Sequence, residues 1–186
     1  QLDMKRLRLL PVFLILAAVA LPARSVKLGA YVGGFIPRDS VFQTIYGDDA
    51  DLTYGLEIDV SVWRGFSLRL RAGHYQRNGE TSFTGEISRL RLYPLTFGLR
   101  YTFRLKRVQP FLEAGYHYLL VTETSAIGET SEQGGGYDLT AGAGFPLSSR
   151  FSLEVSVHYT DVSITAATQT IQMGGFSAGL AFLVLL

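Results

Sequence analysis

Hydrophobic and polar residues alternate with a period of two along most of the chain beyond residue 25. The stretch DVSVWRGFSLRLRAG, residues 59–73, shows this pattern twice, with Val or Leu at every second place and a turn at Trp-Arg-Gly between the two runs. A period of two is typical of a β-strand whose two faces differ. We expect eight such strands, at about residues 26–37, 52–62, 66–75, 86–103, 110–121, 137–145, 151–160 and 171–186. One or two helical turns are expected only near residues 39–47, where Asp39 can cap them.

The connections between these strands alternate between long and short. The first, third, fifth and seventh are long and polar, at residues 38–51, 76–85, 122–136 and 161–170. The second, fourth and sixth are short, at residues 63–65, 104–109 and 146–150. An even number of antiparallel strands with long loops at one end is the pattern of outer-membrane barrels. Soluble up-and-down barrels also have eight strands, so this pattern alone leaves the surroundings of the barrel open.

The size of the side chains indicates which face points outward. One face of each strand is bulky and apolar, as at Leu95, Phe97 and Leu99, whereas the other carries mostly Gly, Ala, Ser and Thr with a few charges. The interior of an eight-stranded barrel is barely wide enough for its own side chains. The bulky face must therefore point outward into lipid, with the backbone hydrogen bonds satisfied by closing the sheet. The sequence predicts an all-β fold, an eight-stranded antiparallel up-and-down transmembrane β-barrel over residues 26–186.

The first 25 residues differ from the rest and read as a secretory signal peptide. Lys5, Arg6 and Arg8 precede an apolar run that ends at Leu21, and small residues follow it. The run is too short for a comfortable transmembrane helix. Met4 is read as the initiator, with upstream start-site residues before it. Without residues 1–25 the net charge changes from +1 to −2, which leaves no basic surface for nucleic acid.

The same alternation places charged residues inside the barrel. If residues 63–65 form a three-residue loop, Asp59 lies opposite Arg69 and Glu57 opposite Arg71 on the inner face. Opposite charges in a narrow lumen pair because an unpaired buried ion is costly. Further expected pairs are Arg100 with Glu113, Asp138 with His158 and Gly142 with Glu154 inside, and Val62 with Phe66, Phe145 with Phe151 and Tyr137 with Tyr159 outside. The expected luminal polar network consists of Glu57, Asp59, Arg69, Arg71, Arg100, Glu113, Asp138, Glu154 and His158.

Two local features complete the expected barrel. The apolar phase changes at Tyr93-Pro94, and because Pro donates no hydrogen bond to a ladder, a bulge is expected there. Aromatic residues gather at the strand ends, where a barrel crosses the membrane interface. The belt expected at the short turns consists of Trp63, Phe66, Phe103, Phe111, Phe145 and Phe151. The faces of the first strand cannot be assigned, because Gly occurs on both parities.

These patterns, with the segments FIPRDSVFQTIYG, LRLYPLTFGLRYTF, VQPFLEAGYHY and GGFSAGLAFLVLL, resemble the bacterial outer-membrane β-barrel domain family of the OmpA, OmpX and OmpW type. The resemblance implies a location in the outer membrane of a Gram-negative cell, among lipid and lipopolysaccharide. It also implies that the last strand carries the signal for the barrel-assembly machinery. The residues matching that signal are Ser177, Gly179, Phe182 and Val184. The family ends in an aromatic residue, whereas this chain ends in Leu185-Leu186.

The sequence gives only weak indications of a catalytic or metal-binding site. Ser156, His158 and Asp138 suggest an esterase triad, but the Ser and His lie two apart on one strand and face a packed lumen. The lipid-facing His74 has no neighbouring Ser and acid. Luminal hydrogen bonding explains His117 and His158 better than a metal does. The acidic residues of the first loop are better explained as solvated surface residues than as ligands of a divalent cation. We therefore expect no enzyme, no cofactor and no metal.

The expected function is that of a non-enzymatic outer-membrane barrel with a packed polar lumen. It would display four surface loops in a structural, adhesive or interaction role, with an extracellular ligand as a possible partner of the loops. The alternative is a porin-like narrow pore or passage for small solutes. These two differ in whether the lumen conducts.

Overall fold

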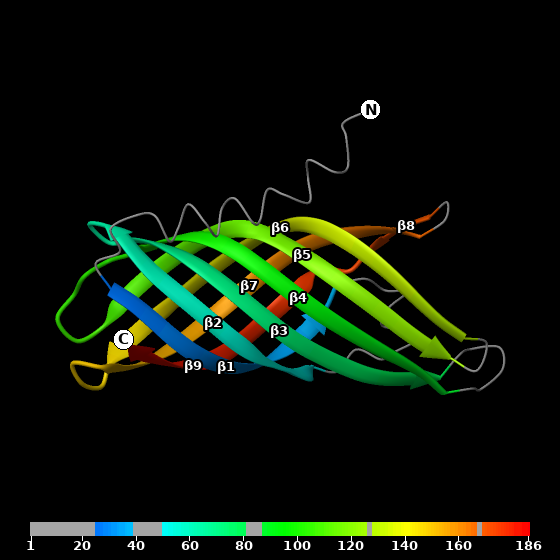
Figure 1. Ribbon diagram of the computed structural model, residues 1–186, viewed down its shortest axis with the longest axis horizontal. Helices are drawn as coiled ribbons and strands as arrows, with labels where there is room; N and C mark the ends of the chain where they lie inside the picture. Colours follow the sequence, from blue (N-terminus) through cyan, green and yellow to red (C-terminus); the bar gives the residue numbers. More distant parts are fainter. Residues whose placement is uncertain (1–24, 39–49, 81–86, 126–127, 167–168) are drawn as a thin grey trace, which may run out of the picture.

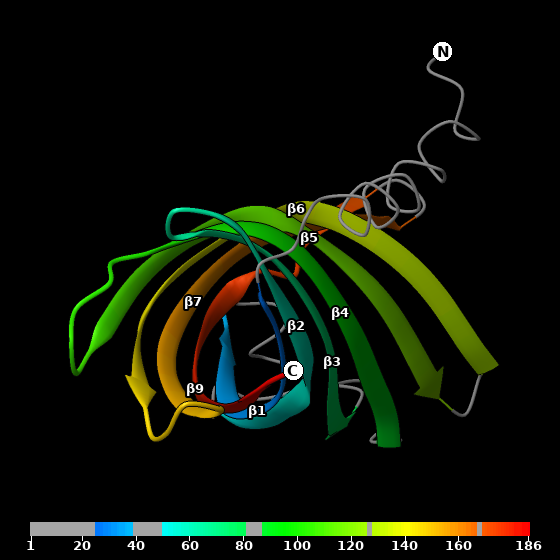
Figure 2. The same ribbon diagram turned by 60° about the vertical axis from the view of Figure 1, so that its left-hand side comes forward.

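The computed structural model describes residues 25–38, 50–80, 87–125, 128–166 and 169–186, which form one antiparallel sheet closed into a barrel (Figures 1 and 2). Successive strands are neighbours from β1 to β7, and the pairings of β1 with β9 and of β9 with β7 close the ring. The strands are β1 Ser25–Pro37, β2 Asp51–Trp63, β3 Phe66–Glu80, β4 Ile87–Thr102, β5 Gln109–Ser125, β6 Gly128–Pro146, β7 Phe151–Ala166, β8 Gln169–Gln172 and β9 Gly175–Leu185. Within these ranges, no helix is long and apolar enough to cross a membrane.

The short strand β8 and the strand β9 are two parts of the eighth barrel strand. Ser163 of β7 lies opposite Gln172, and Thr160 lies opposite Gly175, so the register is the same on both sides of the break. At the break, the N–H of Met173 donates to a β7 carbonyl at 2.8 Å. In the described ranges β8 pairs only with β7. The architecture is therefore the expected eight-stranded up-and-down barrel.

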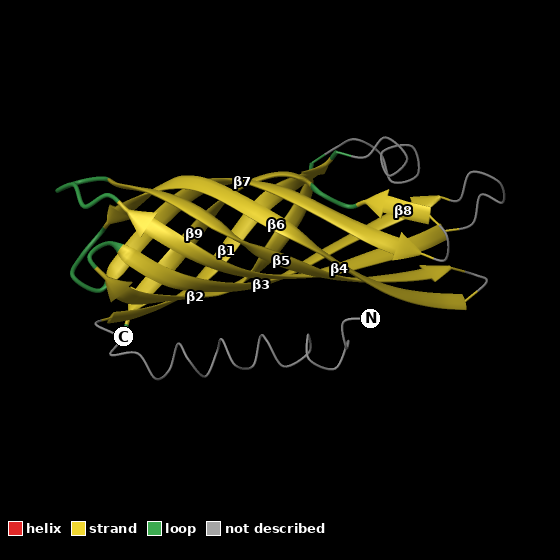
Figure 3. Ribbon diagram, turned by 90° about the horizontal axis from the view of Figure 1, so that it is seen from above, coloured by secondary structure: helices red, strands yellow, loops and turns green. Residues whose placement is uncertain are grey.

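The predicted short connections lie at one end of the barrel, and the strands at the other end are longer than expected (Figure 3). The long polar segments 76–85, 122–136 and 161–170 were expected to be loops, but much of each continues the strands of its hairpin. β6 has 19 residues, whereas about 9–11 suffice to cross a membrane. Polar composition indicated that these segments leave the membrane, but it did not exclude hydrogen-bonded strand beyond it.

The turn between β2 and β3 differs from the expected three-residue loop. Trp63 lies opposite Phe66, so the loop is the two-residue pair Arg64-Gly65, and the register shifts between Ser61 and Trp63. Both loop residues have positive φ, 35° for Arg64 and 97° for Gly65, as in a type I′ turn. The extra residue of the resulting bulge is absorbed beside the turn, so Val62 does not oppose Phe66. Beyond the bulge Asp59 lies opposite Arg69 and Glu57 opposite Arg71, as expected. Glu57 and Arg71 form an ion pair, but Asp59 makes its ion pair with Arg100 and not with Arg69.

Two other expectations of register are corrected, and one is observed. Between β6 and β7 the pairing is shifted by two residues: Thr140 lies opposite His158, and Gly144 lies opposite Glu154. A shift of two keeps every side chain on its face, so the expected faces hold although the pairs Asp138–His158, Gly142–Glu154, Phe145–Phe151 and Tyr137–Tyr159 are wrong.

At Tyr93-Pro94 the ladders on both sides keep one register, so there is no bulge. Arg100 lies opposite Glu113, as expected.

The two faces of the barrel are as unlike as the alternation predicts. Neighbouring residues of β4 illustrate this, since Leu99 is 51% exposed on the outside and Arg100 is 2% exposed on the inside. In β1 the odd-numbered residues face inward, since Gly29 pairs with Glu57 and Leu183, while Leu28 and Val32 are exposed outside. The interior is charged in its middle and apolar toward the long-strand end. The apolar cluster there consists of Tyr75, Leu90, Leu92, Leu119, Val121, Val162 and Ile164, with Phe35 and Met173 packed against it.

This apolar cluster explains the change of phase at Tyr93-Pro94. Leu90 and Leu92 point into the barrel, whereas Leu95 points out, without any irregularity of the strand between them. The inner face itself changes from polar to apolar along β4. The predicted signal peptide, residues 1–25, and the predicted helical turn at residues 39–47 lie outside the described residues, apart from Ser25, which begins β1.

Candidate functional site

A layer of ion pairs crosses the middle of the lumen. Arg69 lies at its centre, 1% exposed, and contacts carboxylates from three other strands. Its Nη2 pairs with Glu57 and, at 2.9 Å, with Glu154, and its Nη1 lies 3.3 Å from Glu113. Arg69 therefore joins β2, β5 and β7 to β3 across the barrel axis.

Two further arginines extend this layer. Arg100 Nη1 lies 2.9 Å from both carboxylate oxygens of Glu154 and 3.6 Å from Asp59, and its Nε lies 3.3 Å from Glu113. Arg71 Nε donates to Glu57 at 3.3 Å. Each carboxylate of the layer thus meets at least one arginine, which compensates the cost of burying it.

Phe111 belongs to this luminal layer and not to the aromatic belt where the sequence placed it. The side chain is 2% exposed, and its ring lies 3.6 Å from the guanidinium carbon of Arg100 and 5.8 Å from that of Arg69. This is the geometry of a cation–π contact. Gly142 of β6 makes room for the ring, because a Cβ at that position would collide with it. Phe111 has the parity of Glu113, two residues later, which is why it faces inward.

The cavities of the lumen lie on either side of this layer. A polar cavity of about 310 Å³ at the short-turn end is bordered by Lys27, Asp59 and Arg100. A second cavity, of about 80 Å³, is bordered by Arg71 and the apolar cluster toward the long-strand end. Neither cavity reaches Arg69 or Glu113, which separate them. The ion-pair layer around Arg69 thus lies between the two cavities.

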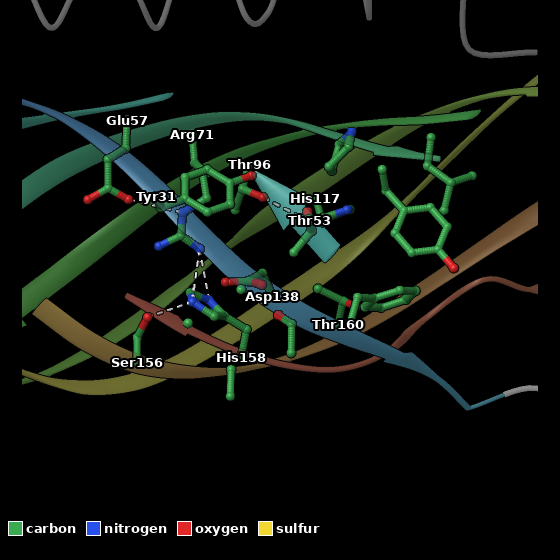
Figure 4. Close-up of a pocket in the computed structure, with 18 of the residues that line it drawn as sticks. Tyr31, Thr53, Glu57, Arg71, Thr96, His117, Asp138, Ser156, His158 and Thr160 are labelled. Atoms are coloured by element: carbon green, nitrogen blue, oxygen red, sulfur yellow. Dashed lines mark hydrogen bonds and ion pairs between the residues drawn. The ribbon is translucent and has the colours of Figure 1, made fainter. Parts of the chain in front are cut away.

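The second cavity has a polar side formed by residues of several strands (Figure 4). Arg71 Nη1 lies 2.8 Å from His158 Nδ1. Thr96 Oγ1 and His117 Nδ1 are 2.9 Å apart. Tyr31 lies against Arg71, with the guanidinium carbon 5.2 Å from the ring centre. Its opposite side is apolar and includes Phe35, Tyr75, Leu92, Leu119 and Met173.

Ser156, His158 and Asp138 come together in this cavity, but not as a catalytic triad. Ser156 Oγ lies 2.8 Å from His158 Nε2, whereas Thr140 stands between His158 and Asp138, 2.6 Å from the first and donating to the second at 2.8 Å. Arg71 Nη1 lies beside both ring nitrogens of His158, 2.8 Å from Nδ1 and 3.2 Å from Nε2. The acid of a catalytic triad bonds the imidazole directly, whereas within the described residues Asp138 reaches His158 only through Thr140.

The other aromatic residues of the predicted belt lie on the outside of the barrel near the short turns. Trp63 and Phe66 stack with ring centres 6.1 Å apart, and Phe66 contacts Tyr101 at 4.8 Å. The exposed outer residues of the set also include Phe103, Phe145 and Phe151. At the other end, His74 lies between Tyr54 and Tyr93, with ring centres at 5.5 and 5.2 Å. The outer surface thus carries aromatic rings toward both ends.

The residues of the predicted assembly signal lie on both faces of β9. Ser177 and Gly179 face the lumen beside β1, while Phe182 is exposed outside and stacks on Phe151 with ring centres 5.6 Å apart. Val184 lies opposite Leu28 of β1 and Phe151 of β7. Among the described residues, no group of three or more His, Cys, Asp or Glu side chains is arranged to hold a metal ion.

Sequence reasoning missed the apolar side of the second cavity and its polar residue Tyr31. It placed Thr96 and Thr140 on the inner face but did not include them in the polar network. A signal for the apolar side was present, since Leu119 and Val121 share the parity of Glu113 and His117. Tyr31 had no such signal, because glycines occur on both parities of β1. Its ring lies over Gly73 of β3, where a Cβ would collide with the phenol oxygen.

The chain belongs to a family of bacterial outer-membrane proteins. Residues 10–182 match the model of the outer membrane protein beta-barrel domain, so the protein is an outer-membrane β-barrel surrounded by membrane lipid. No curated protein matches the chain in sequence.

Several solved structures share the fold. Neisserial surface protein A is 12% identical, with 87% of this chain and 96% of that chain covered and a TM-score of 0.66. OprG from Pseudomonas aeruginosa is 16% identical, with 89% and 97% covered and a TM-score of 0.67. Ail, the attachment invasion locus protein of Yersinia pestis, was solved with the heparin analogue sucrose octasulfate. It is 15% identical, with 86% and 96% covered and a TM-score of 0.50.

Proposed function

We propose that this protein is a closed, non-enzymatic barrel with a structural and interaction role, which presents its long-strand end outside the cell. The observation that carries the proposal is the ion-pair layer around Arg69, which separates the two cavities of the lumen. A barrel closed in this way does not conduct. What remains available for function is the surface beyond the membrane.

The surface beyond the membrane supports an interaction role. In outer-membrane barrels the short turns face the periplasm and the longer connections face outward. Here the hairpin of β5 and β6 extends to Ser125 and Gly128 and is polar along its end. A rigid, hydrogen-bonded hairpin presents side chains with less loss of conformational entropy on binding than a flexible loop does. Ail, which shares the fold, is an attachment protein seen with a heparin analogue, and an extracellular ligand is proposed here by that analogy only.

Conductance across a planar lipid bilayer tests the closed lumen. The wild-type protein is expected to give no stepwise conductance, and the double variant Arg69→Ser with Phe111→Ala is expected to conduct because it removes the central arginine and the ring beside it. Leu99→Ala, on the lipid face, serves as the control for insertion and should behave as wild type. Conductance steps from the wild-type protein would overturn the proposal.

The second candidate function is the passage of small solutes. The observation that favours it is the cavity of about 80 Å³ at the long-strand end, which has an apolar side and a polar side. Liposome swelling in solutions of small apolar and polar solutes distinguishes the two candidates. Faster swelling than with protein-free liposomes would support passage, whereas equal rates support the closed barrel.

We also propose roles for the N-terminal segment, the last strand and the outer aromatic residues. Residues 1–25 are proposed to be a signal peptide, so N-terminal sequencing of the membrane-extracted protein should begin near Val26. Ser177, Gly179, Phe182 and Val184 are proposed to be read by the barrel-assembly machinery. The outer aromatic residues are proposed to lie at the membrane interfaces, with lipopolysaccharide against the long-strand end.

A further inference from the structure

The acidic side chains buried in the lumen outnumber the buried arginines, and one acid differs from the rest. Glu57, Glu113 and Glu154 pair with Arg69, and Asp59 pairs with Arg100. Asp138 is buried on the same inner face, 2% exposed, yet it has no ion pair within the described part of the chain. A buried carboxylate without a cation is costly, so its surroundings have to supply compensation.

The hydrogen bonds of Asp138 are incomplete. One carboxylate oxygen, Oδ1, accepts from Thr140 Oγ1 at 2.8 Å. Among the described residues Oδ2 has no hydrogen-bond partner, and Asp138 borders the cavity at the long-strand end (Figure 4). The nearest cation on this side, Arg71, is held by Glu57 at 3.3 Å and by His158 at 2.8 Å. Asp138 therefore offers an unused carboxyl oxygen to the cavity.

The cavity above Asp138 suits a short apolar group. Its volume is about 80 Å³, and its far side is formed by Phe35, Tyr75, Leu92, Leu119 and Met173. Phe35 and Tyr75 contact each other edge to face, with ring centres 5.6 Å apart. Apolar cavities of this order of size hold small hydrocarbons. The aromatic rings that line the cavity also attract a cation.

We propose that this cavity binds a small primary amine as its ammonium ion, with the nitrogen at Asp138 and a short apolar tail against the Tyr75–Leu92–Leu119 side. An ammonium group supplies the positive charge that Asp138 lacks and donates to the open oxygen. A carboxylate ligand would add to the negative excess of the lumen, and an alcohol would supply no charge. The site depends on the cavity alone, so it holds whether or not the lumen conducts.

Titration of the refolded protein with three ligands of one shape tests the proposal. The probes are n-butylamine, n-butanol and butyrate, added at neutral pH to protein in detergent micelles, with binding followed through the backbone NMR resonances of Asp138 and Thr140. Only the amine is expected to give saturable shifts at low concentration. Asp138→Asn keeps the shape of the side chain and should weaken amine binding about tenfold or more, while leaving any weak alcohol binding unchanged.

A matched control separates the site from general charge effects. Asp59→Asn makes the same change of charge at the short-turn side of the ion-pair layer and should leave the amine affinity as in wild type. Gel mobility before and after boiling shows that each variant is folded. Equal or tighter binding of butyrate or butanol, unchanged amine binding in Asp138→Asn, or no saturable binding of the amine would each overturn the proposal.

Discussion

At the scale of single residues, the barrel is governed by parity along each strand. Leu99 and Arg100 are neighbours in β4, but one is exposed to the membrane and the other contacts Glu154, Glu113 and Asp59 in the lumen. The same type of side chain thus stabilises or destabilises the protein according to which face of the strand it occupies. Substitutions at these two positions separate the effects of lipid and of lumen.

Leu99→Arg is expected to destabilise the barrel by about 2–4 kcal/mol if the position lies near the middle of the membrane, because it exposes a charge to hydrocarbon. Reversible urea unfolding in lipid vesicles measures the change in the free energy of unfolding. Leu99→Ala is the control for loss of the side chain alone. A neutral effect of Leu99→Arg would contradict the outward placement of this residue.

Arg100→Leu is expected to cost about 3–5 kcal/mol, because it leaves buried carboxylates with one arginine fewer. Arg100 makes its shortest contacts, at 2.9 Å, with Glu154 and a longer one, at 3.3 Å, with Glu113. A second change to Leu at Glu154 should therefore restore more stability than one at Glu113. Double-mutant cycles in the same unfolding assay give the two coupling energies, and a larger coupling to Glu113 would contradict the geometry.

The residues that sequence reasoning placed correctly are those on strands whose two faces differ clearly in size and polarity. It misplaced Phe111 because nearness to a turn was given more weight than the parity shared with Glu113. It did not identify the partners of Arg69, since the sequence gives neighbours across one ladder but not contacts across the barrel axis. Those contacts depend on which side chains have a glycine opposite, as Phe111 has Gly142.

At the scale of elements, strand pairing is determined by turn geometry that the hydrophobic pattern does not resolve. A pattern of period two distinguishes odd from even registers but not registers that differ by two. For this reason the predicted register between β6 and β7 was wrong by two residues. At the β2–β3 turn, the pattern required an odd number of residues outside the regular pairing. The structure meets this requirement with a two-residue loop and one extra residue in a bulge.

The β2–β3 turn carries a non-glycine residue at positive φ, and this gives a prediction. Arg64 has φ of 35°, a conformation that costs most L-residues roughly 1–2 kcal/mol and that Asn adopts more readily. Arg64→Asn should stabilise the barrel by about 0.5–1 kcal/mol, less whatever the stacking of Arg64 on Trp63 contributes. Arg64→Lys, which keeps the charge and the strain, is the control in vesicle unfolding. Equal stability of the Asn and Lys variants would contradict this account.

At the scale of the whole molecule, every strand of the ring is paired on both sides along the membrane-crossing part. The closing pairs of β1 with β9 and of β9 with β7 run over eleven and ten positions respectively. A closed ring leaves no edge strand from which detergent or another chain can begin to open the sheet.

The folded protein should therefore resist dodecyl sulfate and migrate differently on a gel before and after boiling. Because the closing ladders supply this resistance, a variant with Pro at Val32, in the middle of β1, should lose the heat-dependent shift. A variant with Ala at Val32 should keep it. Identical mobility of boiled and unboiled wild type would contradict a closed barrel.

The charges of the inner face also constrain how the protein reaches the membrane. Each of the strands β2 to β7 brings at least one buried Asp, Glu or Arg to the lumen. A single strand of this set in a bilayer would expose its charge to hydrocarbon, at a cost of about 2–4 kcal/mol for an arginine, and its backbone would lack partners. Partial insertion in lipid alone is therefore unfavourable, and this favours a pathway in which the strands cross the bilayer and the ring closes together.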